Sequence, residues 1–156
     1  MTSFTSRYGD LAVDYRGAHA WAYLRHAATI VAIKGRIDSA NVERLTEYAL
    51  RFVTADRPFA LDLTGLTSLT AGAAPLLAGI ADRCGAAGTG WALVAGESVQ
   101  RRLSEALSGA LSEALSEADV ASLPLVATLA EAEHQFDEAI QSRRRALLSL
   151  VGKKTA

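Results

Sequence analysis

The chain has 156 residues, 50% of them hydrophobic, which is enough to fill the core of one domain. Its 16 basic and 17 acidic side chains nearly cancel, so net charge does not direct the whole molecule toward nucleic acid or an anionic membrane. A single cysteine excludes an internal disulfide framework and fits a reducing compartment, and the histidines are too dispersed to form a metal site with it. With no signal-peptide core and no apolar run of membrane-spanning length, we expect a cytoplasmic protein without cofactor or metal.

The first half of the chain predicts an arm, two strands and a helix. Residues 1–16 are polar and rich in Thr and Ser, which is typical of a loose arm outside the core. Apolar runs at 20–24 and 28–33 predict adjacent strands that could form a hairpin. Asp38 and Ser39 are N-cap candidates for a helix over 38–53. Its apolar positions recur at spacings of three and four residues: Val42, Leu45, Ala49, Phe52 and Val53.

The next elements alternate between strands and helices. We expect a buried strand at 59–63, a loop at 64–70, and a helix that ends at the glycine cluster 85–90. Another strand follows at 91–96, so right-handed crossovers and a largely parallel sheet are expected. The near-repeat in residues 98–122 predicts one extended or broken helix.

The last part of the chain predicts a short strand and a long final helix. Residues 122–128 read as the strand, and Thr128 can cap the helix that follows. One side of that helix is expected to carry Leu129, Ala132, Phe136, Ile140 and Leu147. The fold class is therefore α/β, a single domain with a mostly parallel mixed sheet of about five strands and about four helices. We divide the chain into an arm (1–16), the domain (17–141) and a basic and apolar helix end (142–156).

The sequence lacks the motifs of the common nucleotide-binding and hydrolytic sites. Gly85, Gly88 and Gly90 follow a helix and precede a strand, whereas a phosphate cradle lies between a strand and a helix N-terminus. No Walker motif and no nucleophile elbow occurs. His26 and His134 have no Ser or Cys arrangement around them, and Cys84 on an apolar helix predicts a small packing residue. We expect a protein that is not an enzyme.

The C-terminal end combines basic and apolar residues. Arg143, Arg144 and Arg145 either complement the helix dipole or contact an anionic partner. Leu147, Leu148, Leu150 and Val151 follow them on several faces of the helix. This end is expected either to pack under the arm or to contact a partner, for instance in a homodimer.

Three stretches together resemble the STAS domain of anti-sigma factor antagonists over about residues 20–140: "VAIKGRIDSANVERL", "FALDLTGLTSLTAGAAPLL" and "GWALVAGESVQRRL". The family's Gly-x-x-Asp before the first helix is matched by Gly35 and Asp38. Its Asp-Leu-Ser-x-Val is matched by Asp62, Leu63, Thr64 and Leu66. The short actinobacterial members look most similar.

This resemblance implies a non-enzymatic switch that binds an anti-sigma factor, which is often also a protein kinase. In the family, phosphorylation of a Ser or Thr at the start of the second helix breaks that contact, because a phosphate adds about −1.5 to −2 charges. The usual Asp-Ser-Ser-Gly is replaced here by Thr70, Ala71, Gly72 and Ala73. Thr70 is either a displaced phosphoacceptor or a helix cap. Pro75 implies that the helix starts near Gly72 or is kinked there.

The expected partner contact lies at the loop and helix start 64–75 and the neighbouring turn. Its residues are Asp38, Ser39, Asn41, Thr67, Ser68, Thr70, Ala71 and Gly72. Candidate phosphorylation sites are Thr70 and, for a separate Ser/Thr kinase acting on the arm, Thr2, Ser3, Thr5 and Ser6. Two other functions stay open: a scaffold that oligomerises through its C-terminal helix, and a sensor of a small ligand or nucleotide. Neither nucleic acid nor a membrane is expected as a direct partner.

Overall fold

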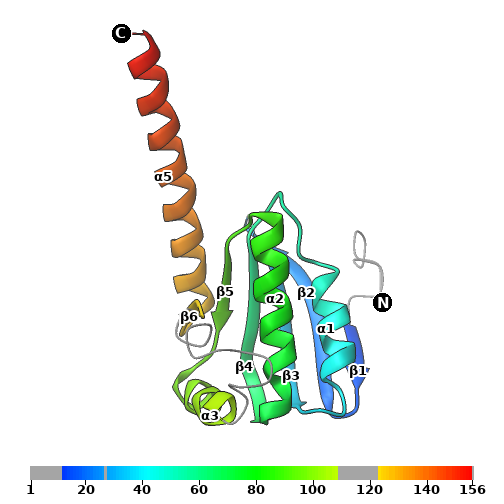
Figure 1. Cartoon of the computed structure of the whole chain (residues 1–156). Helices are drawn as coiled ribbons and strands as arrows, with labels where there is room; N and C mark the ends of the chain where they lie inside the picture. The colour runs from blue at the N-terminus through cyan, green and yellow to red at the C-terminus, as the bar shows by residue number, and fades with distance from the viewer. Residues whose placement is uncertain (1–11, 27, 109–122, 156) are drawn as a thin grey trace.

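The computed structural model describes residues 12–26, 28–108 and 123–155 and shows a sheet of six strands in the order β1-β2-β3-β4-β5-β6 (Figure 1). Strand β2 pairs antiparallel with β1 and with β3, and β3 to β6 run parallel. The strands are β1 (Ala12–Tyr15), β2 (Ala18–Arg25), β3 (Ala28–Ile37), β4 (Phe59–Leu69), β5 (Trp91–Val94) and β6 (Leu125–Val126). The predicted α/β class, the strand hairpin and the mostly parallel mixed sheet are confirmed.

Helices lie on both faces of this sheet (Figure 1). Within the described residues they are α1 (Val42–Leu50), α2 (Ala74–Ala87), α3 (Glu97–Ser108) and α5 (Leu129–Thr155), with a 3-10 turn η2 (Ala71–Ala73) before α2. The main core joins α1, α2 and α3 to alternate strand residues such as Ile33 and Leu61. On the other face, Ala132 and Phe136 of α5 pack on Ile30, Ala60 and Val94.

Residues 12–15, expected to belong to the loose arm, form strand β1 at the edge of the sheet. They pair antiparallel with β2 in the register Ala12↔Trp21 to Tyr15↔Ala18. Val13 and Tyr15 pack against the main core, while Asp14 points to the exposed side. The alternation of half-buried and exposed residues spans only four positions, too few to predict a strand among polar neighbours. With β1 the sheet has six strands, one more than expected.

The expected loop at 64–70 is wrong for residues 64–69, because β4 continues to Leu69. Its second half pairs with the end of β3, for example Gly35↔Leu66 and Ile37↔Leu69. Leu66 is buried and Thr67 exposed, so the alternation of a half-buried strand persists. The hydroxyl-rich composition is typical of loops, but Thr also favours strands when it lies on an exposed face.

Helix α1 begins later than the predicted residue 38, and neither Asp38 nor Ser39 caps it. The chain turns at 38–41, and Asn41 occupies the N-cap position without a side-chain bond to the helix. Leu45 and Ala49 are fully buried as expected, whereas Phe52 and Val53 lie beyond the helix end. The Asp38 carboxylate instead accepts a hydrogen bond from the backbone N–H of Ala40.

The start of the second helix is as predicted from Thr70 and Pro75. The Thr70 hydroxyl accepts the N–H of Gly72 at 3.3 Å and caps η2. Regular α-helix follows from Ala74, with Pro75 in its first turn. Gly88 ends α2 in the left-handed conformation (φ 69°), which confirms the C-cap interpretation of the glycine cluster.

Helix α3 covers part of the predicted 98–122 region, and residues 109–122 lie outside the described part of the chain.

Thr128 caps α5, because its hydroxyl accepts the N–H of Glu131 at 3.2 Å. The C-terminal part of α5 projects past the sheet (Figure 1). Leu147, expected on the packed side, is 62% exposed. We call residues 141–150 the α5 overhang. None of the described helices is long and apolar enough to cross a membrane.

Candidate functional site

The predicted contact residues gather where β3 and β4 end. Because parallel strands end at the same edge of a sheet, the turn at 38–41 and the segment 67–72 lie side by side. The backbone N–H of Thr70 donates to the carbonyl of Ile37 at 3.2 Å and ties the two segments together. We call this surface the carboxyl edge, which comprises Asp38, Ser39, Thr67, Ser68, Thr70, Ala71 and Gly72.

Gly72 and Ser39 make the closest approach within the carboxyl edge. A Cβ added to Gly72 would lie 2.7 Å from the Ser39 nitrogen and 3.1 Å from its Cα. Side chains do not tolerate such distances to backbone atoms, so only glycine allows the turn to lie directly on the start of η2. The predicted residues from two distant stretches therefore form one continuous surface.

Asn41, the eighth predicted contact residue, lies beneath this surface. Only 1% of its area is exposed. Its side-chain amide donates to the carbonyls of Tyr15, Arg16 and Arg36 at 3.1, 3.2 and 2.8 Å, and its oxygen accepts the N–H of Asp38 at 3.1 Å. Asn41 thus joins β1, β3 and the turn, and holds the 38–41 turn in shape.

Arg36 flanks the carboxyl edge on its β3 side. The guanidinium of Arg36 lies 3.1 Å from the carboxylate of Asp38 and donates to the carbonyl of Arg16 at 3.3 Å. Gly17 makes this route possible, since a Cβ there would lie 2.8 Å from the Nη2 atom of Arg36 and its φ is +98°. Arg36 and Asp38 are both partly exposed, so their ion pair orients the turn more than it stabilises the fold.

Arg102 of α3 is a residue of this site that the sequence analysis did not single out. Its guanidinium donates to the carbonyl of Thr67 at 2.7 Å. A helix that follows the next parallel strand starts at the same edge, so the topology would have indicated α3 as a neighbour. Arg36 and Arg102 thus place one guanidinium group on each flank of the edge.

The hydroxyls of the carboxyl edge differ in what holds them. Thr67 donates its hydroxyl hydrogen to the carbonyl of Gly35 at 3.0 Å, and the Thr70 hydroxyl acts as the cap of η2. Thr70 and Ala71 are exposed, so a partner or a modifying enzyme can reach both positions. Thr2, Ser3, Thr5 and Ser6 lie outside the described residues.

Cys84 is a core residue of α2. Cys84 is buried in α2, and burial raises the pKa of its thiol to about 11. A thiol held neutral in this way packs and does not attack substrates, as the sequence predicted. Among the described residues, no three His, Cys, Asp or Glu side chains gather where they could hold a metal ion.

Known proteins similar to this chain agree with the fold. The STAS domain model matches residues 22–132. Osmosensory protein A of Mycobacterium tuberculosis is 38% identical over 151 residues, which is 97% of this chain and 91% of that protein. The implied similarity to actinobacterial proteins is thereby confirmed.

Two solved structures share the architecture. An anti-sigma factor antagonist from Mycobacterium paratuberculosis superposes with a TM-score of 0.59 at 23% identity, over 77% of this chain and 94% of that chain. The anti-sigma factor antagonist SpoIIAA, in its unphosphorylated form, superposes with a TM-score of 0.52 at 14% identity, over 74% of this chain and 94% of that chain. At these identities the likeness concerns the fold.

Proposed function

Because this chain belongs to the STAS domain family, we propose that it is a protein-binding regulator that captures an anti-sigma factor through its carboxyl edge. The observation that carries the proposal is the direct contact between Gly72 and the Ser39 backbone, which makes the two predicted contact segments one surface. Two proteins of the same fold are named as anti-sigma factor antagonists, which supports this class of partner.

The chemistry of the edge supports binding in preference to catalysis. It offers exposed hydroxyls, a methyl group at Ala71 and flanking guanidinium groups, but the described residues of the edge include no histidine, cysteine or lysine. A surface of this kind recognises a partner by shape and charge. The arginines on both flanks favour a partner that presents carboxylates.

We further propose that any phospho-switch at this edge uses Thr70. Ala71 stands where related proteins carry the phosphorylated serine, and it has no oxygen to modify. Thr70 is exposed, but its hydroxyl also caps η2, so phosphorylation there would replace a cap bond with a charged group at a helix start. If Thr70 only caps the helix, binding is constitutive or is regulated from the arm.

The test is affinity capture from the native cell with three forms of the full chain: wild type, Thr70→Glu and Ser149→Glu. Ser149 lies on the α5 overhang, so its variant adds the same charge far from the carboxyl edge. We expect wild type and Ser149→Glu to retain an anti-sigma factor and Thr70→Glu to lose it. Mass spectrometry of the captured chain then shows whether phosphate lies on Thr70 or on the arm.

The opposite outcomes are informative. If wild type retains no anti-sigma factor, the proposed function fails. If Thr70→Glu retains it as well as wild type does, the partner binds elsewhere on the molecule and the carboxyl edge is not the contact.

A further inference from the structure

The apolar side of α5 continues beyond the sheet that it covers. Ala132 and Phe136 are buried against the sheet, and Ile140, the next residue of the same helical stripe, is half-buried. Seven residues farther on, past Arg143 and Arg144, the same side of the helix carries Leu147 and then Leu150, which are 62% and 57% exposed. A stripe that serves only to pack on the sheet would end with Ile140.

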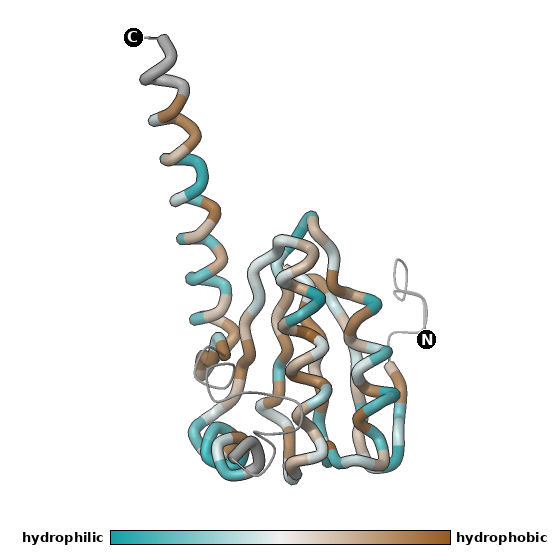
Figure 2. The backbone as a smooth tube through the Cα atoms, in the orientation of Figure 1, coloured by the Kyte–Doolittle hydropathy of each residue, from teal (hydrophilic) through white to brown (hydrophobic). Residues whose placement is uncertain are grey.

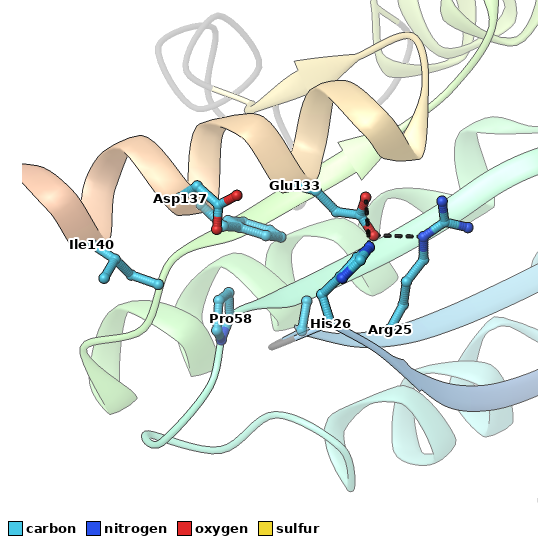
Figure 3. Close-up of a pocket in the computed structure, with 8 residues that line it drawn as sticks. Arg25, His26, Pro58, Glu133, Asp137 and Ile140 are labelled. Carbon is cyan, nitrogen blue, oxygen red and sulfur yellow. Dashed lines mark hydrogen bonds and ion pairs between the residues drawn. The ribbon is translucent and has the colours of Figure 1, made fainter.

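Two neighbouring hollows lie where α5 leaves the sheet. Their volumes are about 160 and about 140 Å³, and both are lined by Pro58, Phe136 and Ile140. Figure 3 shows the first of them, with Ile140 and Pro58 at one end and the carboxylate of Glu133, held by Arg25, at the other. Each hollow is apolar in part and large enough to admit an aliphatic side chain.

The charges of α5 divide along its length. The first half carries Glu131, Glu133, Asp137 and Glu138, and the overhang carries Arg143, Arg144 and Arg145. Two such helices side by side in the same direction would place arginines against arginines and carboxylates against carboxylates. In opposite directions, the basic half of each faces the acidic half of the other. The surface is therefore complementary to itself.

We propose that α5 mediates an antiparallel homodimer, in which the overhang of each copy packs on the hollows of the other. The two helices cross near Gln141, so Leu147 and Leu150 of one copy lie against the partner's hollows beside Phe136. In this register Arg144 and Arg145 of one copy face Glu138 and Asp137 of its partner. Arg143 lines the second hollow together with Asp56, which supplies a carboxylate beside the arginines at the crossing point. Such a contact is isologous and closes on itself, so it yields a dimer and not a filament.

The expected dimer is weak and depends on protein concentration. The overhang contributes about ten residues per copy, whereas a standard interface uses about 20–30 residues a side. Figure 2 shows that hydrophobic and hydrophilic residues alternate along the projecting part of α5. Such a mixed surface is compatible with exposure to water in the monomer. This inference concerns self-association alone and stands whether or not the carboxyl edge binds an anti-sigma factor.

Sedimentation of the purified full chain over a wide concentration range is the first test. We expect wild type to shift from the monomer mass of 16.4 kDa toward twice that value as concentration rises. The double variant Leu147→Glu/Leu150→Glu should stay monomeric, while the control Ser149→Glu should dimerise like wild type, because Ser149 lies on the opposite side of the helix. Since none of these residues is buried, circular dichroism should show all three forms folded.

Cross-linking with a short bismaleimide tests the orientation. Arg143→Cys lies near the crossing point and should link to itself across the dimer. Leu150→Cys should not, because in an antiparallel pair that crosses near Gln141 the two positions are about 27 Å apart along the helix axes. The native Cys84 is buried and does not compete for the reagent.

Several results would overturn the proposal. They are a monomer at every concentration, a dimer that survives Leu147→Glu/Leu150→Glu, and efficient self-linking of Leu150→Cys, which indicates parallel helices. Binding of the overhang to anionic lipid vesicles without self-association would also overturn it, and would assign the basic and apolar surface to a membrane instead.

Discussion

At the scale of single residues, the carboxyl edge depends on Asn41 and Gly72, which shape its backbone. Asn41 satisfies three carbonyls and one N–H under the turn, and Gly72 leaves room for the Ser39 backbone. Neither has reactive chemistry, and both act through the backbone that they hold. The shape of the edge is therefore sensitive to substitutions beneath it as well as on it.

Replacing Asn41 with alanine should destabilise the protein by about 3 kcal/mol, because buried carbonyls of β1 and β3 lose their donor. Urea unfolding followed by circular dichroism measures this change. Ser39→Ala, an exposed position in the same turn, is the control and should change stability by less than about 0.5 kcal/mol. Equal effects of the two variants would mean that the bonds of Asn41 are not what holds the turn.

Replacing either of two glycines with alanine should change the free energy of unfolding, but in opposite directions. Gly72→Ala forces a methyl group to 2.7 Å from the Ser39 nitrogen and should cost about 1–3 kcal/mol. Gly85 lies within α2 with no atom within 4 Å of an added Cβ, so Gly85→Ala should stabilise the helix by about 0.5–1 kcal/mol. Thermal unfolding of both variants checks the signs, and a stabilising Gly72→Ala would contradict the close approach.

The buried thiol of Cys84 predicts a loss of stability at high pH. Its pKa is raised by burial from 9.0 to about 11, so above about pH 9 the unfolded chain releases this proton and the folded protein does not. The contribution is complete below pH 9 and is lost as pH rises through about 11, at a total of roughly 2–3 kcal/mol. Unfolding free energies of wild type and Cys84→Ala, measured from pH 8 upward, should converge as the pH rises. Parallel curves would mean that the thiol is not desolvated.

At the scale of elements, helices and buried strands could be predicted because their apolar periodicity is set by the main core. Leu45, Leu76 and Ile80 follow helical spacing, and all are fully buried. The second half of β4 could not be predicted, since Thr64 to Ser68 resemble a loop until β3 is seen to run beside them. The turn at 38–41 was mistaken for a helix start because Asp and Ser favour both positions.

The carboxyl edge was predictable from topology and family resemblance, but its supporting contacts were not. The bonds of Asn41 connect residues 25 and 26 positions away, and Arg102 meets Thr67 across 35 positions. Side-chain contacts at such separations leave no periodic signal in the sequence. They follow from the way β1, β3 and α3 are brought to one edge.

Helix α5 behaves as two elements joined end to end. Removing everything after Gln141 should leave the domain intact, because every described side chain from 141 to 150 is exposed. At low protein concentration the melting midpoint should change by less than about 2 °C. Phe136→Ala, inside the packed half, is the comparison and should cost about 3–4 kcal/mol. A large shift on truncation would show that the overhang packs on its own domain.

At the scale of the whole molecule, the two proposed surfaces lie at opposite ends of the sheet (Figure 1). The carboxyl edge lies where the parallel strands end, and the α5 overhang projects beyond the end at which they begin. Substitutions at sites so far apart, with no shared contacts, are expected to act additively.

Thr70→Glu should therefore leave the dimer mass unchanged, and Leu147→Glu/Leu150→Glu should leave anti-sigma factor binding by the monomer unchanged. The double-mutant cycle that combines both changes measures the coupling, which should be close to zero in each assay. A dimer that binds the anti-sigma factor more tightly than the monomer variant would show that the two ends communicate or that avidity operates.

The strict agreement between strand order and chain order has a consequence for how the protein is made. Each strand from β2 to β6 pairs with the strand that precedes it in the sequence, so a chain leaving the ribosome finds the partner of every new strand already in place. Loop closures between successive strands stay short, and folding can keep pace with synthesis. Helix α5 emerges after β6, so the proposed dimer surface becomes available only after the sheet beneath it is complete.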